Sequence, residues 1–282
     1  MCYVLKVALL RIFPLGHPVE ITSDDTPALD AAAQRWPERE EFFDVEPLRF
    51  AMEVSPAGTI FHVPEFVPAA DGFLVNCGPA GGADFDVASR TGRLRSDSSA
   101  LELLLETLVL TALDWTFFIG VHAACVMREG RSVLFCGHSQ AGKSTLAYAC
   151  ARADWTFVSD NALHWSSKPW NVLVSGSGRL RLRDGARAMF SLEANEVTPR
   201  EHGMQCSTTA PAGPLVFLQR RPGPAAWRPS SPGDVMKYLA HYDTRPDRAH
   251  AEERYRALLQ HGAWLLEYED VWDAVRVLEK VS

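Results

Sequence analysis

The chain has 282 residues, of which 47% are hydrophobic and 22% charged, and this is the composition of a folded globular protein rather than a disordered one. Its net charge of −7 and its pI of about 5.7 exclude the basic surface by which proteins bind nucleic acids or anionic membranes. We therefore expect neither nucleic acid nor a membrane as a partner.

The six cysteines are dispersed, with no C-x-x-C pair and no His/Cys cluster at the spacing of zinc ligands. They are interpreted as reduced thiols of a cytoplasmic protein. The apolar N-terminus is interrupted by Lys6 and Arg11, and no small-residue cleavage site follows it. A strand is therefore favoured there over a signal peptide.

Residues 1–97 read as short strands and turns, with a turn near 90–92 and a loop-like, Pro- and Gly-rich stretch over 64–82. This pattern predicts a β-rich N-terminal domain or flank over residues 1–97. The expected strands lie within residues 3–12, 42–54, 59–63, 72–76 and 84–96.

The run from Leu108 to Met127 is apolar enough to be tested as a membrane span. Asp114 lies within it, and an ionisable group at that depth is costly. Its front half continues a helical pattern that begins near residue 99, while its back half is β-branched and aromatic. The run therefore predicts a helix over about 99–114 followed by one buried strand over 119–127.

From residue 98 onward the pattern alternates between strands and helices with short connections, which is typical of an α/β domain. We place this second domain at residues 98–282. Strands are expected at 132–136, 155–159, 215–221 and 263–268, and helices at 144–153, 232–241, 247–260 and 270–281.

The most informative stretch is FCGHSQAGKST, residues 135–145, which has the frame of a phosphate-binding loop. A strand ending at Gly137 and a helix starting near Lys143 aim several backbone N–H groups into one concave turn, where an anion fits. The alternative is an ordinary strand-to-helix turn with an exposed lysine. The candidate nucleotide-binding residues are Gly137, His138, Ser139, Gln140, Ala141, Gly142, Lys143, Ser144 and Thr145.

Three side chains of this loop have specific expected roles. Lys143 supplies positive charge to the β- and γ-phosphates of ATP, and the Ser144 hydroxyl is a ligand for Mg²⁺. Thr145 is a candidate contact for the α-phosphate. We interpret the His138 side chain as a variable part of the loop rather than as a functional group.

The other lysines stand in no base-reading motif of a GTPase, and we find no long apolar strand that ends in the acidic pair of a motor or transporter ATPase. The predicted strand 155–159 instead leads directly into Asp160, 23 positions after Gly137. Asp160 is a candidate base for the acceptor hydroxyl or a holder of the metal's water, and the alternative is a turn cap.

The strand GVHAACV with His122, the loop GHSQAGKST, its helix and the segment FVSDNALHW together resemble the HPr serine kinase/phosphorylase group. The resemblance covers roughly residues 84–280, with specific motifs only over 119–165. LRLRDGA and PLVFLQRR are similar to more divergent kinases of that group, including those of lasso-peptide biosynthesis, which phosphorylate a hydroxyl of a precursor peptide.

The resemblance implies an α/β kinase core like that of phosphoenolpyruvate carboxykinases, a mixed sheet flanked by helices. It implies transfer of the γ-phosphoryl group of ATP, with Mg²⁺, to a hydroxyl of a peptide, a protein serine or a small metabolite. Lys143, His122 and Asp160 are then the catalytic residues, with Asp160 as the base, His122 near the γ-phosphate, and Ser144 and Asp160 as the metal-binding pair. It also makes a homo-oligomer a possible assembly.

Other readings of these residues remain open. His122 alone fits a satisfied core histidine, and Asn161 stands where HPr-acting relatives have a second acidic residue, which allows a catalytically silent nucleotide-binding regulatory module. ATP hydrolysis that drives a conformational change lacks a water-positioning motif. Candidate phosphate or acceptor contacts, each also readable as surface charge or core packing, are Arg181, Arg183, Arg220, Arg221, Trp165, Trp170 and Trp227.

Overall fold

The computed structural model describes residues 7–36, 40–56, 62–167, 169–242 and 248–281. The chain divides into two compact units, Met1–Phe117 and Phe118–Ser282. Residues 3–6 and 59–61 of the predicted strands and residue 247 of a predicted helix lie outside the described residues.

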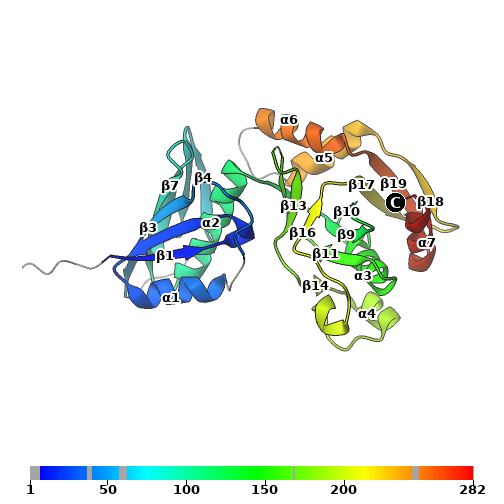
Figure 1. Ribbon diagram of the computed structural model, residues 1–282, viewed down its shortest axis with the longest axis horizontal. Coiled ribbons are helices and arrows are strands. Elements are labelled where there is room, and N and C mark those ends of the chain that lie inside the picture. The colour runs from blue at the N-terminus through cyan, green and yellow to red at the C-terminus, as the bar shows by residue number, and fades with distance from the viewer. Residues whose placement is uncertain (1–6, 37–39, 57–61, 168, 243–247, 282) are drawn as a thin grey trace, which may run out of the picture. The chain divides into compact units, whose positions relative to one another are not determined.

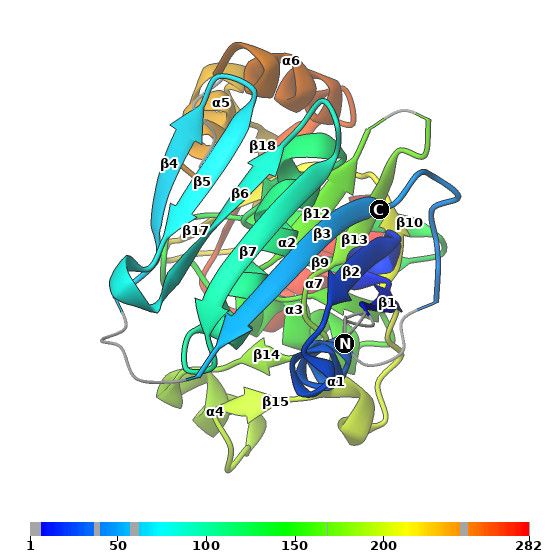
Figure 2. The same ribbon diagram turned by 90° about the vertical axis from the view of Figure 1, so that its left-hand side faces the viewer.

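The first unit is built on a mixed seven-stranded sheet with the order β1-β2-β3-β7-β6-β5-β4 (Figure 2). Strands β2, β3 and β7 are parallel neighbours, and the other pairs are antiparallel. The elements are β1 (Ala8–Ile12), η1 (Pro14–Gly16), β2 (Val19–Ser23), α1 (Thr26–Arg35), β3 (Leu48–Ser55), β4 (Glu65–Ala69), β5 (Gly72–Asn76), η2 (Gly78–Ala80), β6 (Gly81–Asp86), β7 (Thr91–Asp97) and α2 (Leu101–Thr116).

Helix α2 packs against β5, β6 and β7 and against α1. Its buried face includes Leu104, Leu108 and Val109, which meet the inward side chains of a sheet that alternates buried and exposed residues. The predicted boundary at 97/98 assigned this helix to the second domain. The contacts assign it to the first, because its apolar face is covered by that sheet.

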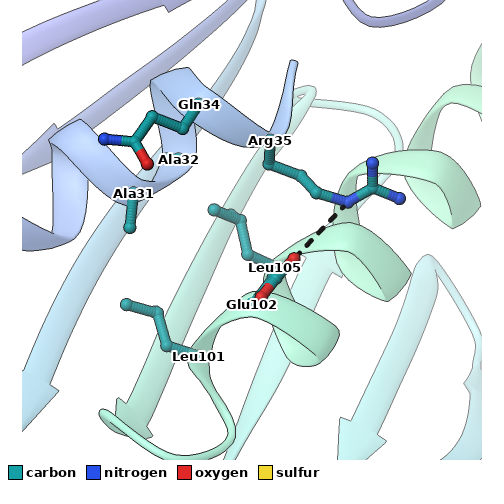
Figure 3. Close-up of a pocket in the computed structure, with 7 residues that line it drawn as sticks. All are labelled: Ala31, Ala32, Gln34, Arg35, Leu101, Glu102 and Leu105. Carbon is teal, nitrogen blue, oxygen red and sulfur yellow. Dashed lines mark ion pairs between the residues drawn. The ribbon is translucent and has the colours of Figure 1, made fainter. Parts of the chain in front are cut away.

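The N-terminal unit contains more regular secondary structure than its sequence pattern predicts. The strand expected at 72–76 is β5, but the Pro- and Gly-rich stretch 64–82 also contains β4, and residues 24–36 contain helix α1, which starts with the Asp25 carboxylate capping the Ala28 N–H. Arg35 at the end of α1 forms an ion pair with Glu102 of α2 (Figure 3) and another with Glu106. The pair with Glu102 lies beside a hollow of about 370 Å³ between the two helices.

The second unit contains a six-stranded sheet with the order β11-β9-β10-β17-β19-β18, a four-stranded sheet β16-β13-β12-β8, and the pair β14-β15. Strands β10, β17 and β19 run parallel. The strands are β8 (Ile119–Val121), β9 (Ala124–Arg128), β10 (Arg131–Cys136), β11 (Thr156–Ser159), β12 (Leu163–Ser166), β13 (Val172–Ser175), β14 (Leu180–Arg181), β15 (Glu196–Val197), β16 (Thr209–Pro211), β17 (Leu215–Arg220), β18 (Ala226–Pro229) and β19 (Ala263–Tyr268).

Helices cover both faces of the six-stranded sheet, α3 and α7 on one side and α5 and α6 on the other (Figure 1). In β10 the residues alternate between the two cores: Val133 and Phe135 face α3 and α7, while Leu134 and Cys136 face α5 and α6. The helices are α3 (Lys143–Arg152), α4 (Asp184–Phe190), η3 (Pro199–His202), α5 (Pro232–Tyr242), α6 (Arg248–Leu259) and α7 (Val271–Val281).

The apolar run 108–127 is divided among three elements: the end of α2, β8 and β9. The single strand predicted over 119–127 is wrong, because the chain leaves one sheet after Val121 and joins the other at Ala124. Within the described part of the chain, every helix is too short or too polar to cross a membrane.

Gly72 marks a close approach of backbones in the first sheet. A Cβ atom there would lie directly on the carbonyl oxygen of Phe85 in β6. We expect Gly72→Ala to lower the free energy of unfolding by about 1–3 kcal/mol, because the sheet must shift to admit the methyl group. Urea unfolding measures the loss. Gly178→Ala, whose Cβ would meet no atom within 4 Å, is the control, and equal midpoints for the two variants would contradict the prediction.

Candidate functional site

The loop between β10 and α3 has the backbone that its glycines were expected to provide. Gly137 has φ 144° and Gly142 has φ 99°, values in the region that favours glycine. A Cβ at Gly142 would also lie 2.5 Å from the Tyr268 hydroxyl. The predicted strand and helix flank this loop, with β10 ending at Cys136 and α3 beginning at Lys143.

Lys143 is folded back into the loop and is only 8% exposed. Its ammonium donates to the carbonyl oxygen of Gly137 at 2.6 Å and to that of His138 at 3.4 Å. Burial lowers the pKa of Lys143, while the proximity of Cys136 and Asp160 opposes that shift. The side chain is therefore an inward-facing cation at the N-terminus of a helix, and the exposed-lysine alternative does not describe it.

Asp160 follows β11 and is 7% exposed. Its Oδ2 accepts a hydrogen bond of 3.0 Å from the backbone N–H of Arg181, 21 positions away, so it is not a local turn cap. Burial raises the pKa of this carboxyl, and the Ser144 hydroxyl, the Arg181 N–H and the Lys143 charge act against the rise. The structure thus brings Asp160, Ser144 and Lys143 together.

The second carboxylate oxygen of Asp160, Oδ1, is buried and lacks a hydrogen-bond partner of good geometry among the described residues. The Ser144 hydroxyl is close enough to stabilise the charged carboxylate but does not satisfy this oxygen. A buried oxygen without a partner is costly, and a cation is one way to satisfy it. Hydroxyl and carboxylate oxygens are the ligands that Mg²⁺ prefers, so the pair fits that ion.

His122 lies where the chain crosses from β8 to β9, rather than within a strand. Its ring stacks on Tyr242 of α5 with centroids 4.2 Å apart and an interplanar angle of 19°. Burial, and after it the charge of Lys143, lowers the pKa of His122. The imidazole is thus favoured in its neutral form near the candidate loop.

Two of the four candidate arginines approach the loop through their side chains. Arg183 donates to the Ser139 hydroxyl at 3.2 Å, and the Arg220 guanidinium lies beside Gly142, over the Tyr268 ring at 4.6 Å. Arg181 contributes its backbone N–H to Asp160. The guanidinium of Arg221 instead pairs with Glu267, at 3.0 Å.

The candidate tryptophans contribute less. Trp165 is a core residue at 2% exposure whose indole N–H reaches Asn171, and Trp227 stacks on Trp264. Trp170 is 38% exposed. The loop itself borders a hollow of about 500 Å³, which residues 137–141 share with the end of β17, Tyr238 and Asp234.

The sequence pattern did not identify two residues of the site, both tyrosines. The Tyr238 hydroxyl bonds to Gly137, and the Tyr268 hydroxyl to Ala141, in both cases at the backbone carbonyl. They lie 101 and 127 positions from the residues they contact. Only the expected helix 232–241 and the expected strand 263–268 are visible in the sequence, and neither indicates what the hydroxyl contacts.

The chain matches no protein-family model and no curated protein. One solved structure that it resembles is the HPr(Ser) kinase/phosphatase from Coxiella burnetii, at a TM-score of 0.31 and 15% identity, covering 50% of this chain and 98% of that one. A score this low assigns no activity to the chain. Its fold class is mixed α/β, with several sheets and flanking helices.

The raised pKa of Asp160 has a consequence for stability. Because the folded-state pKa lies above the unfolded-state pKa, the charged carboxylate opposes folding at neutral pH, and this penalty is absent below the unfolded-state pKa, about 4. We expect Asp160→Asn to melt at a higher temperature than the wild type at pH 7, with a difference that shrinks towards pH 4.

Thermal unfolding at several pH values measures this difference. Asp71→Asn, which changes an exposed turn carboxylate, is the matched control and should show no comparable gain. A destabilised Asp160→Asn at pH 7 would show that the carboxylate is a net stabilising group.

Proposed function

We propose that the chain is an ATP-dependent kinase that transfers the γ-phosphoryl group of Mg-ATP to a hydroxyl group. The observation that carries the proposal is the buried Asp160 carboxylate, with a raised pKa, beside Lys143 and Ser144 at the glycine loop. The acceptor class is a peptide or protein serine or a small metabolite, as the sequence resemblance implies.

The chain's own residues supply each requirement of phosphoryl transfer. Loop N–H groups and the Lys143 ammonium bind the phosphates, and Arg183 and Arg220 are placed to offset negative charge around the loop. Ser144 and Asp160 would hold Mg²⁺, which when bound neutralises charge on the phosphate oxygens. ATP and Mg²⁺ are therefore the proposed cofactors.

Asp160 is proposed to act as the base. Its carboxylate takes the proton of the acceptor hydroxyl while that oxygen forms a bond to the γ-phosphorus and the bond to the ADP oxygen breaks. A carboxyl with a raised pKa accepts a proton more readily than an exposed one. The role proposed for His122, which is favoured in its neutral form, is the one that the sequence resemblance implies: to donate to a phosphate oxygen or to shape the ionisation of Asp160.

A catalytically silent nucleotide-binding regulatory module is the second candidate. It is favoured by Asn161, which is exposed and offers no charge where HPr-acting members of the resembled group carry a second acidic residue. Such a module would bind ATP at the same loop and turn over no acceptor. Both candidate functions include ATP binding, and only the kinase transfers the phosphoryl group to an acceptor.

Binding is tested by calorimetry with Mg-ATP. We expect the wild type to release or absorb heat on binding and Lys143→Ala to bind at least about tenfold more weakly, because the loop loses its only side-chain cation. Lys237→Ala removes an exposed lysine of α5 and should bind as the wild type does. Absence of any heat with the wild type would refute both candidate functions.

Transfer is tested with γ-labelled ATP, Mg²⁺ and hydroxyl acceptors, including serine peptides, small alcohols and a cell lysate. We expect labelled product with the wild type and a loss of at least about 100-fold with Asp160→Asn, because the base is removed. The variant should still bind Mg-ATP. Binding without transfer to any acceptor would favour the silent module, and full transfer by Asp160→Asn would remove Asp160 from the mechanism.

A further inference from the structure

A buried phenol joins two parts of the candidate site that belong to different segments of the chain. The Tyr238 hydroxyl of α5 lies 2.8 Å from the carbonyl oxygen of His122 and 3.0 Å from the carbonyl oxygen of Gly137. Both partners are acceptors, so Tyr238 is the donor and its proton is shared between them. One hydroxyl therefore contacts the crossover from β8 to β9 and the first residue of the glycine loop.

The Gly137 carbonyl is held from two directions. It accepts from Tyr238 and also from the Lys143 ammonium at 2.6 Å. If Lys143 turns its charge towards a bound phosphate, its contact with this carbonyl weakens. When it turns away, Tyr238 remains as a donor, so the buried carbonyl keeps a partner in both states.

A second phenol lies at the other end of the loop. The Tyr268 hydroxyl of β19 donates to the carbonyl oxygen of Ala141 at 3.4 Å. Because a peptide group is planar and trans, fixing a carbonyl also fixes the opposite direction of the next N–H, here those of His138 and Gly142. The two tyrosines thus restrain the orientation of N–H groups at both ends of the loop.

Helix α5 also contacts the side chain of His122. Tyr242 lies one helical turn after Tyr238 and stacks on the imidazole, while Tyr238 bonds the backbone carbonyl of the same residue. His122 is therefore fixed by α5 at both its backbone and its ring. The Tyr238 ring packs edge-on against Phe217, so the hydroxyl is itself held in place.

We propose that Tyr238 is a positioning residue that sets His122 and the start of the glycine loop in a fixed relation, with Tyr268 restraining the far end of the loop. This inference rests on the proposed nucleotide-binding function of the loop. Tyr238 touches neither phosphate nor acceptor in this scheme, and acts only through the two carbonyls that it holds.

The test is Tyr238→Phe, which keeps the ring and removes only the hydroxyl. We expect its Kd for Mg-ATP to rise about 5- to 10-fold, the loss expected for one buried hydrogen bond. In protein labelled with ¹³C-histidine, the His122 side-chain signal should move without nucleotide present. The control is Tyr148→Phe, which removes a buried hydroxyl that has no hydrogen-bond partner among the described residues. This control should change neither the Kd for Mg-ATP nor the His122 signal.

Tyr268→Phe distinguishes specific positioning of His122 by Tyr238 from a general loosening of the glycine loop. It should weaken Mg-ATP binding and leave the His122 signal in place, because Tyr268 holds only the far end of the loop. The inference is overturned if Tyr238→Phe matches Tyr148→Phe in both readings, or if Tyr268→Phe moves the His122 signal as far as Tyr238→Phe does.

The outcomes also separate this inference from the proposed function. A wild type that binds no Mg-ATP would refute the proposed function, and the His122 signal would still report whether Tyr238 holds that residue. A wild type that binds Mg-ATP, with Tyr238→Phe unchanged in affinity and signal, would refute this inference alone.

Discussion

The candidate site of the second unit is built around two buried charges held near each other. Lys143 and Asp160 are each less than a tenth exposed. Burial lowers the pKa of Lys143 and raises that of Asp160, so it favours the neutral form of each group. The backbone satisfies the ammonium through the loop carbonyls and one carboxylate oxygen, Oδ2, through the Arg181 N–H. The glycine loop and the Arg181 segment thus keep these two groups in place.

The sheet explains how residues so far apart in the sequence meet. Strand β9 lies between β10 and β11 and runs antiparallel to both, so the ends of β10 and β11 leave the sheet at the same edge. The glycine loop follows one of these strands and Asp160 follows the other, while His122 lies just before β9 begins at that edge. Helix α5 then fixes His122 and the loop from outside the sheet.

The sequence predicts those parts of this arrangement that are local. Alternating and helical patterns place β10, α3, β17, β19 and α7 to within one or two residues, and the glycine spacing marks the loop. The split at His122 is invisible because the run through it is uniformly apolar, and only the pairing partners of β8 and β9 separate them. The assignment of α2 to the first unit and the tyrosine contacts are likewise decided by tertiary packing, which a single sequence does not display.

The contact between Lys143 and the Gly137 carbonyl bears on selectivity. In the structure the ammonium already has an internal partner at 2.6 Å, so an incoming anion must compete with the protein's own dipoles for it. A singly charged ion would gain little from that exchange, whereas a chain of phosphates would present several charges to the lysine and the loop amides at once. Under the proposed function, a lysine that already has an internal partner would therefore favour polyanions over abundant small anions.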